Sequence, residues 1–497
     1  MRLLGLFKLY ELFLRSGWGL AFKLEPMNLV AGVDSSTQSC KVVIRELESG
    51  RLVRSGSAKH PDGTEVDPQF WWDALLSAIA DAGGLDDVAA ISVAAQQHGL
   101  VALDAEGNVV RPALLWNDTR SAQSALDLIS QFGATELASR TGSVPVASFT
   151  ITKLRWLRDN EPQNAARVAA VALPHDWLSW RLRGFGPAGS SALGPDLTQL
   201  VTDRSDAAGT GYFNSETNTY DHELVIAALG HLPILPRIAH PDEKIGQVHS
   251  SISVAQPVIA CGAGDNAGAA LGLGAKAGDI VISLGTSGTI FAVTEQSTKD
   301  ASGTIAGFAD ASGHYLPIAV TLNAARVLAT TAALLGVSFD ELAELALKAP
   351  IGSDGLVLVP YFEGERTPNL PDAKASLHGM SIASTTRENL ARASIEGMLC
   401  GLNHGLQALA GMGVIGNRIL LIGGAAQNLA VQKVATTIFE LPVEVPTPGE
   451  YVADGAAVQA AWALTGSRPE WSIGIAAKYE VATAPEVMRA YLELAGA

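Results

Sequence analysis

The stretch Gln256–Val293, QPVIACGAGDNAGAALGLGAKAGDIVISLGTSGTIFAV, decides the fold that we expect for this chain. Within it, Pro257–Ala260 has the length and apolar character of a strand, and it leads to Gly262, Gly264 and Asp265. Because glycine carries no side chain, we expect these two residues to let a ligand approach the main chain. A carboxylate, that of Asp265, then comes directly before a run of small residues that suits a helix.

The second half of this stretch has the pattern of a strand, a tight polar turn and a returning strand. Asp279–Ser283 is the first strand, GTSG at 285–288 is the turn, and Thr289–Val293 is the second strand. Backbone N–H groups and hydroxyls at such a turn can hold anionic oxygens. The sequence therefore predicts a phosphate-binding hairpin one segment after Asp265.

The same pattern occurs near the start of the chain. Leu29–Gly32, the turn DSSTQS at 34–39 and Cys40–Arg45 repeat the order of strand, turn and strand, so that Thr37 matches Thr286. A single turn of this kind is more often an ordinary hairpin. An internal repeat separated by half the chain instead favours two similar α/β lobes that face each other across a nucleotide cleft.

The composition indicates a globular protein and excludes several classes. Of the 497 residues, 48% are hydrophobic and 17% are charged, which is typical of chains that bury extensive cores. The net charge of −16 weighs against a nucleic-acid partner, which would need a basic surface. Cys40, Cys261 and Cys400 have no CxxC spacing, so the sequence indicates neither a disulfide framework nor a structural zinc site. A reducing cytoplasm fits this pattern.

The segment Met1–Pro26 differs from the rest of the chain. Its apolar runs are interrupted by Lys8, Glu11 and Arg15, so we expect no stable insertion into a membrane. An amphipathic helix on a membrane surface is one interpretation. We prefer a second interpretation, in which synthesis starts at Met27 and residues 1–27 are an extension outside the fold.

Two more predicted strands end in polar side chains. Val88–Ala95 is followed by Gln97 and His98, and Ala113–Leu115 is followed by the cluster WNDTR at 116–120. Ligands of open α/β sheets bind at the carboxyl ends of the strands. We therefore favour ligand contact for His98 over a purely structural role. For the second cluster, a cap by Asn117 or Asp118 on the following helix is an equally good interpretation.

The second half of the chain adds weaker signals. We interpret the charged turn EGERTP at 363–368 as a salt-bridged loop rather than as catalytic. Thr385 and Glu388 have capping-box spacing, which predicts a helix start. Arg418–Ile422 reads as a strand that opens into a glycine pair and then Asn428, a turn that permits close approach of a flat nucleoside. His175 and Asp176 are interpreted as structural.

In this order, the segments resemble the FGGY carbohydrate kinases from residue 28 to 466. The motifs that carry the resemblance are VAGVDSSTQSCK, AAQQHG, LLWNDTR, CGAGDNAGA, SLGTSG, PYFEGERTPNLPDAKA, ENLARASIEG and IGGAAQN. The resemblance implies an α/β fold of two actin-like (RNase H-like) lobes with a nucleotide and sugar cleft between them. It places the N-terminal lobe, with the sugar site and the base, at 28–274, the ATP-binding C-terminal lobe at 275–468, and a tail segment at 469–497.

The resemblance also implies an activity and its partners. It implies the phosphorylation of a ketopentose such as D-xylulose, with ATP and Mg²⁺, in the cytoplasm. Ribulose, another polyol or glycerol is the alternative substrate, and a non-catalytic ATP-dependent sugar sensor is the alternative class. The expected partners are the sugar and ATP, and a homodimer is kept open as the assembly.

Finally, the resemblance assigns roles to individual residues. Asp265 is the general base, and Asp34 with Asp265 is expected to hold the metal ion. Gln97 stands where the family usually has Met, and Ser36 replaces a customary Gly. The residues expected to bind the sugar are Gln97, His98, Trp116, Asn117, Asp265 and Asn266, and those expected to bind ATP are Thr37, Lys41, Gly285, Thr286, Gly424 and Asn428.

Overall fold

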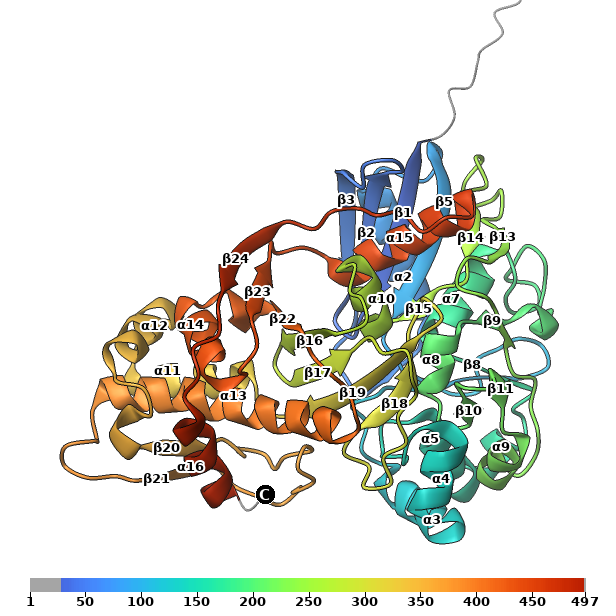
Figure 1. The fold of residues 1–497 in the computed structure, drawn as a ribbon. Helices are drawn as coiled ribbons and strands as arrows, with labels where there is room; N and C mark the ends of the chain where they lie inside the picture. Colours follow the sequence, from blue (N-terminus) through green and yellow to red (C-terminus); the bar gives the residue numbers. More distant parts are fainter. Residues whose placement is uncertain (1–27, 496–497) are drawn as a thin grey trace, which may run out of the picture.

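The fold is that of a computed structural model, which describes residues 28–495. The expectation for residues 1–27 lies outside this range. Two seven-stranded mixed sheets form the two halves of the molecule (Figure 1).

The first sheet has the order β13 (Lys244–Gln247), β14 (Val258–Ala260), β5 (Val88–Ala95), β1 (Leu29–Ser35), β2 (Ser39–Glu46) and β3 (Leu52–Lys59), with β15 (Ala263–Gly264) also beside β5. The second has the order β18 (Ala306–Ala309), β19 (Tyr315–Thr321), β17 (Gly288–Ala292), β16 (Asp279–Leu284), β22 (Arg418–Ile422), β23 (Val443–Pro446) and β24 (Ile475–Tyr479).

The two sheets share one topology. In the first, β1 and β2 form an antiparallel hairpin, β3 continues it, and β5 and β14 add on the other side in parallel. In the second, β16, β17, β19, β22 and β23 repeat the same arrangement. The internal repeat predicted from the two hairpins is therefore confirmed, as is the α/β fold of two lobes.

Helices cover both faces of the first sheet. Helix α2 (Pro68–Asp81) begins after the N-cap Asp67, whose side chain accepts from the backbone N–H of Gln69, as its Asp-Pro start predicts. It packs on β2 and β3, while α15 (Tyr451–Thr465) packs on β1, β5 and β14. Since side chains alternate along a strand, Ala31 and Val33 face the α2 side and Val30 faces α15.

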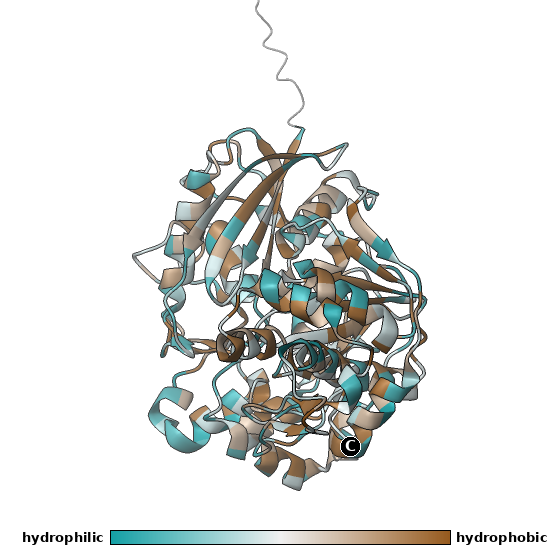
Figure 2. Ribbon diagram, turned by 90° about the vertical axis from the view of Figure 1, so that its left-hand side faces the viewer, coloured by the Kyte–Doolittle hydropathy of each residue, from teal (hydrophilic) through white to brown (hydrophobic). Residues whose placement is uncertain are grey.

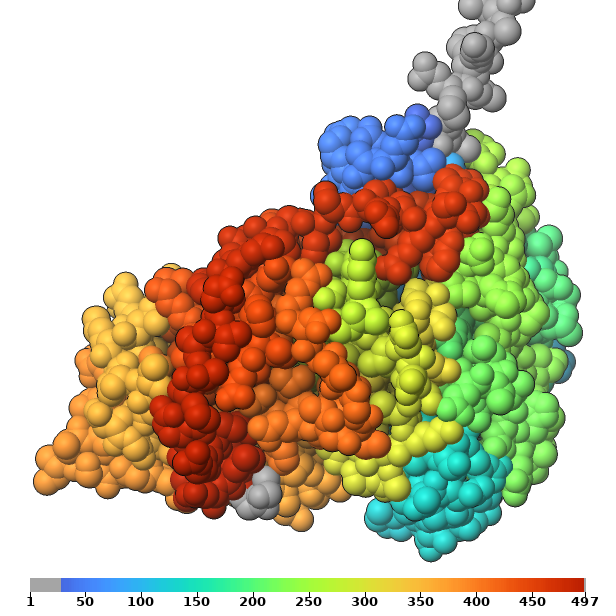
Figure 3. All heavy atoms as spheres, in the orientation of Figure 1, coloured from blue at the N-terminus to red at the C-terminus, as the bar shows by residue number. Residues whose placement is uncertain are grey.

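Helix α15 lies late in the sequence, yet it covers the first sheet. It crosses α10 (Asp265–Gly272) so closely that a Cβ on Gly455 would overlap the carbonyl oxygen of Gly268. Helix α10 also packs toward the second sheet, where Ala267 and Ala270 share a core cluster with Val281. The two helices therefore connect the lobes (Figures 1 and 3).

On the face turned away from α10, the second sheet is covered by α13 (Arg387–Gly411) and α14 (Leu429–Ile438). The N-cap of α13 is Thr386, which accepts from the N–H of Asn389, so the predicted capping box at Thr385 is wrong by one residue. The hydroxyl of Thr385 instead donates to the carbonyl of Ser381, which commits it to the preceding turn. Beyond residue 468, β24 pairs with β23, and α16 (Pro485–Ala495) packs into the same core.

The remaining elements surround these sheets. The other helices are α3 (Ala122–Phe132), α4 (Ala134–Thr141), α5 (Thr150–Asn160), α6 (Pro162–Ala165), α7 (Pro174–Leu182), α8 (Arg204–Ala208), α9 (His222–Leu229), α11 (Ala325–Leu335), α12 (Phe339–Lys348), and the 3₁₀ turns η1 (Leu197–Gln199), η2 (Ser353–Gly355) and η3 (Gly424–Gln427). Short two-stranded sheets pair β4 (Glu65–Val66) with β7 (Ala113–Leu114), β6 (Val101–Leu103) with β8 (Ala170–Ala172), β9 (Val201–Thr202) with β12 (Arg237–Ile238), β10 (Phe213–Asn214) with β11 (Thr219–Tyr220), and β20 (Val357–Val359) with β21 (Ser376–His378).

The strands of the two sheets carry mostly apolar residues, as Figure 2 shows. Both faces are covered at the centre of each sheet, which explains the near-continuous apolar runs of strands such as β1 and β16, whereas the edge strands β3 and β24 are partly exposed. Within residues 28–495, none of the helices combines the length and the apolar character that crossing a membrane requires.

Candidate active site

A cavity of about 600 Å³ is lined by residues of both sequence repeats. Its lining from the first half includes Asp34, Lys41, Gln97, His98, Trp116, Ser148, Phe149, Asp265 and Asn266. Its lining from the second half includes Ser283, Gly285, Ser287, Phe308, Arg366, Gly423, Gly424, Gln427 and Glu450. The cavity thus joins the ends of the two predicted hairpins to the predicted base.

Asp265 is the first residue of α10, directly after β15. Its Oδ1 accepts from the backbone N–H of Asn266 at 2.8 Å and from Asn266 Nδ2 at 2.9 Å. Burial nevertheless raises the pKa of Asp265 to about 6, because these hydrogen bonds only partly offset the loss of water. A carboxylate with this pKa can accept a proton near neutral pH.

Asp34 lies in the same wall, on β1. Burial and, to a smaller extent, the negative charge of Asp265 raise its pKa to about 7, although the positive charge of Lys41 works in the opposite direction. Asp34 Oδ1 is buried and has no hydrogen-bond partner among the residues that the structure describes. An unsatisfied carboxylate oxygen beside a second carboxylate suits a hard divalent cation, so these residues fit the Mg²⁺ ion that a kinase would require.

The sugar-binding residues predicted from the first strand end, Gln97 and His98, both line the cavity. Gln97 Nε2 donates to the carbonyl of Ser205 at 3.0 Å, which leaves Gln97 Oε1 as an acceptor. His98 Nδ1 bonds the carbonyl of Gly209 at 2.6 Å, and since a carbonyl only accepts, Nδ1 carries the proton. Burial lowers the pKa of His98 to about 3, so the ring is neutral and Nε2 is an acceptor.

Lys153 and its neighbours fix the position of His98. The backbone of His98 has a φ of 71°, a left-handed conformation that is unusual for a side chain of this size. Its carbonyl accepts from Lys153 Nζ at 3.1 Å and from Thr150 Oγ1 at 3.2 Å. Its ring stacks on Phe149 with centroids 5.0 Å apart. Lys153 is fully buried, which sequence reasoning missed because a lysine in a helix is normally exposed.

The structure corrects the expectation for Gly262 and Gly264. A Cβ on Gly264 would lie 2.7 Å from Gln97 Nε2, and one on Gly262 would overlap the ring of His175. The close neighbours of these glycines are therefore side chains of the protein, so the prediction that they admit a ligand is wrong. Their small size instead lets Gln97 and His175 pack directly against the turn that precedes Asp265.

In the second cluster, Trp116 lines the cavity, whereas Asn117 is not among its lining residues. Trp116 Nε1 donates to Thr37 Oγ1 at 2.9 Å, so the tryptophan is tied to the turn of the first hairpin. The cap expected from Asn117 or Asp118 is wrong: α3 starts only at Ala122, after Ser121. Asp118 instead accepts from Arg120 Nε at 2.9 Å, because an ion pair is available to it locally.

Both predicted phosphate hairpins contribute residues to the cavity wall. Lys41 pairs with Glu450 at 2.6 Å, which connects the first hairpin to the segment before α15. Of the second hairpin, Gly285 and Ser287 line the cavity, and Thr286 is an exposed residue of the same turn. Thr37 and Thr286 lie at the tips of their hairpins, as the sequence predicted, but neither is itself among the lining residues.

The glycine pair after β22 opens onto the cavity. Gly423 has a φ of 95° and packs on the backbone of Leu284, whereas no atom lies within 4 Å of a Cβ built on Gly424. The space on the Cβ side of Gly424 is thus open to a ligand. Asn428 is placed differently: its Oδ1 caps α14 through the N–H groups of Ala430 and Val431, and it is not among the lining residues.

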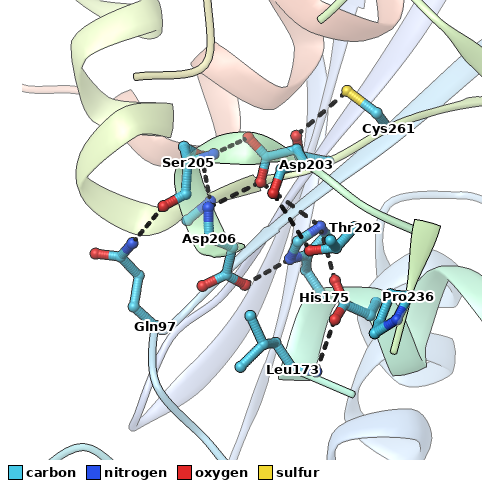
Figure 4. Close-up of polar contacts among 12 residues, drawn as sticks. Gln97, Leu173, His175, Thr202, Asp203, Ser205, Asp206, Pro236 and Cys261 are labelled. Atoms are coloured by element: carbon cyan, nitrogen blue, oxygen red, sulfur yellow. Dashed lines mark hydrogen bonds and ion pairs between the residues drawn. The ribbon is translucent and has the colours of Figure 1, made fainter. Parts of the chain in front are cut away.

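A fully buried polar cluster surrounds His175 (Figure 4). His175 Nδ1 pairs with Asp206 at 2.6 Å, and its Nε2 lies 3.2 Å from Asp176. The aspartates raise the pKa of His175 despite its burial, so it is an imidazolium that links α7 to α8. Ser205 of α8 bonds both Gln97 and, through Oγ, the N–H of Gly264 at 3.1 Å. The structural role expected for His175 and Asp176 is the one seen here.

Arg366 also lines the cavity, contrary to the expectation of a salt-bridged loop for its whole segment. Only Glu363 of this segment forms an ion pair, with Arg326. Glu365 accepts from the backbone N–H of Leu322 at 2.6 Å and from Asn323 Nδ2 at 3.0 Å. The sequence does not show which arginine pairs with Glu363, because Arg326 lies on α11, 37 residues earlier in the chain.

Both halves of the chain are similar to known proteins. The N-terminal domain of the FGGY family of carbohydrate kinases matches residues 29–272, and its C-terminal domain matches residues 280–464. A xylulose kinase of Streptomyces rubiginosus is 43% identical over 92% of both chains, and one of Escherichia coli is 31% identical over 89% of this chain and 91% of its own. The crystal structure of xylulose kinase from Bifidobacterium adolescentis has a TM-score of 0.88 and 46% identity, and it covers 94% of this chain and 99% of its own. The chain therefore belongs to the FGGY family of carbohydrate kinases.

Proposed function

We propose that the protein phosphorylates D-xylulose with ATP to give D-xylulose 5-phosphate. The observation that carries this proposal is the cavity in which Asp265, with its raised pKa, lies beside the sugar-facing acceptors of Gln97 and His98. The relatives named xylulose kinase support this sugar over ribulose, another polyol or glycerol.

In the proposed reaction, the terminal hydroxyl of the sugar attacks the γ-phosphorus of ATP. The new bond joins the sugar oxygen to phosphorus, the bond between the γ-phosphorus and the bridging oxygen breaks, and ADP leaves. Asp265 accepts the hydroxyl proton as the transfer proceeds. Because the transition state of phosphoryl transfer is loose, alignment and charge neutralisation are the main contributions of the protein.

We propose that the remaining residues position the two substrates. Trp116, Asn117 and Asn266 complete the sugar site, since Asn266 already orients Asp265 and Trp116 lines the same cavity. Asp34 with Asp265 would hold Mg²⁺, which when bound neutralises phosphate charge. Lys41, Thr37, Gly285 and Thr286 would contact the phosphates. The open side of Gly424 suits the adenosine, with Asn428 fixing that turn through its cap on α14.

We propose that residues 28–274 and 275–468 act as two lobes that close over the substrates, and that the segment from 469 supports the second lobe. The partners would then be the small sugar and ATP. A cytoplasmic location suits an enzyme that consumes ATP and carries three free, buried cysteines.

A panel of acceptors tests the proposal. The protein with ATP and Mg²⁺ is offered D-xylulose, D-ribulose and glycerol, and ADP release is followed in a coupled assay. We expect the highest kcat/KM for D-xylulose, with the phosphate on its terminal carbon by NMR. A clearly higher kcat/KM for another acceptor would refute the assignment of the sugar. ATP binding without turnover of any acceptor would favour a sensor.

A further inference from the structure

Arg366 is a charged residue of the cavity wall that belongs to neither predicted hairpin. It lies in the loop after β20 of the second lobe and lines the cavity together with His98 and Phe149 of the first lobe. Its guanidinium makes no hydrogen bond or ion pair with any residue between 28 and 495. The two glutamates of its loop are engaged elsewhere, Glu363 by Arg326 and Glu365 by Asn323.

The charge of Arg366 is therefore directed at the cavity without a carboxylate to balance it. Buried charges in proteins are normally paired, since the loss of hydration is costly. The other cation in the wall, Lys41, is already paired with Glu450. The field of Arg366 reaches His98, where it adds to burial and Lys153 in lowering the pKa of the imidazole. Arg366 thus belongs to the side of the cavity where the sugar-facing residues lie.

The chemistry of that side is complementary to Arg366. Gln97 Oε1 is a carbonyl acceptor, held in place by the bond from Nε2 to Ser205, and His98 Nε2 is an acceptor because the ring proton is on Nδ1, which bonds Gly209. The carboxylate of Asp265 is an acceptor as well. Hydroxyls of a sugar can donate to all three groups, whereas a carbonyl oxygen can only accept. A guanidinium only donates, and its hydrogen bonds are strengthened by its charge.

We propose that Arg366 binds the carbonyl oxygen of the acceptor ketose and thereby selects a ketose over the corresponding polyol. The second lobe then contributes directly to sugar recognition, in addition to its contribution to the nucleotide site. This inference rests on the proposed function, because it concerns the same substrate in the same cavity. It predicts that the polyol with the same carbon skeleton gains little affinity from Arg366. Its hydroxyls can instead donate hydrogen bonds to Gln97, His98 and Asp265.

The test compares D-xylulose with xylitol in the Arg366→Gln variant. We expect the KM for D-xylulose to rise at least about tenfold, because the variant loses one charge-assisted hydrogen bond to this substrate. The inhibition constant of xylitol should change less than about threefold, because xylitol has no carbonyl oxygen. The KM for ATP should stay within about twofold. Arg366→Lys should retain part of the affinity, and it serves as the measured variant if Arg366→Gln does not fold.

Arg326→Gln is the matched control, because it removes a guanidinium that contacts the same loop outside the cavity. It should leave all three constants unchanged. Equal losses for xylulose and xylitol would overturn the carbonyl assignment, and a rise confined to the KM for ATP would assign Arg366 to the phosphates instead. If the unmodified protein turned over no D-xylulose, the proposed function would fail. Normal turnover with unchanged constants in the Arg366 variants would refute only the inference.

Discussion

At the residue scale, the cavity holds two carboxylates whose burial opposes their charge. Burial raises the pKa of Asp34 to about 7 and that of Asp265 to about 6. Such groups lower the stability of the fold as the pH rises from about 4 to about 7, because over this range the folded protein still holds protons that the unfolded chain has released. Their presence together in one wall is explained by the reaction, which needs a proton acceptor and a site for positive charge.

The raised pKa of Asp265 predicts the pH dependence of the reaction. The carboxylate is the active form, so kcat/KM should be constant above about pH 7 and fall as the pH drops through about 6. Asp265→Asn should lose about a hundredfold to ten-thousandfold in kcat and still bind ATP, as measured by calorimetry. A profile that stays flat down to pH 5, or an Asn variant of nearly normal activity, would rule out Asp265 as the base.

At the scale of elements, the crossing of α10 and α15 determines how the lobes are connected. Helix α10 starts with Asp265, the proposed base, and α15 packs on the first sheet although it follows most strands of the second sheet in the sequence. Their contact is close because Gly455 meets the backbone of Gly268 and Gly272. The position of the base is therefore coupled to a helix that comes from the far end of the chain.

Substitution of Gly455 tests this contact. In Gly455→Ala, the added methyl group has no space against the Gly268 carbonyl, so we expect a loss of about 1–3 kcal/mol in the free energy of unfolding, as for an overpacked core. Urea unfolding followed by circular dichroism measures this change. Gly411→Ala, at the end of α13 with no atom within 4 Å of its Cβ position, is the control and should be neutral or slightly stabilising. Equal stability of both variants would contradict the packing argument.

At the scale of the whole molecule, the cavity wall is divided between two lobes. The base and the acceptors of the sugar side come from the first half, and the second hairpin, Arg366 and Gly424 come from the second half. A substrate that contacts both walls stabilises the arrangement in which they are closest together. Closure would also exclude water, which would otherwise compete with the sugar for the phosphoryl group.

Small-angle scattering tests this closure. With Asp265→Asn to prevent turnover, we expect the radius of gyration to decrease when D-xylulose and ATP with Mg²⁺ are both added. The sugar alone should give a smaller decrease, since it lacks the contacts to Gly424 and the second hairpin. If scattering stayed the same with both ligands, the lobes would not move and the cavity would be preformed.

The sequence by itself determined the two hairpins, the strand that leads to the base and the duplication that predicts two lobes. These features are encoded locally, by apolar runs of strand length, by small polar turns and by caps such as Asp67. The family resemblance added the order of the motifs and the role of Asp265. Boundaries that depend on competing local hydrogen bonds, such as the N-cap of α13 at Thr386, were less well determined.

Only the tertiary structure decided which side chains share the cavity. Lys153 holds the His98 backbone across 55 residues, α15 returns to the first sheet, and Arg366 rather than Arg326 lines the cavity. Gly262 and Gly264 likewise pack on His175 and Gln97. The physical reason is that these contacts join residues far apart in the chain. Their partners are set by how the two sheets and their helices pack, which no local pattern encodes.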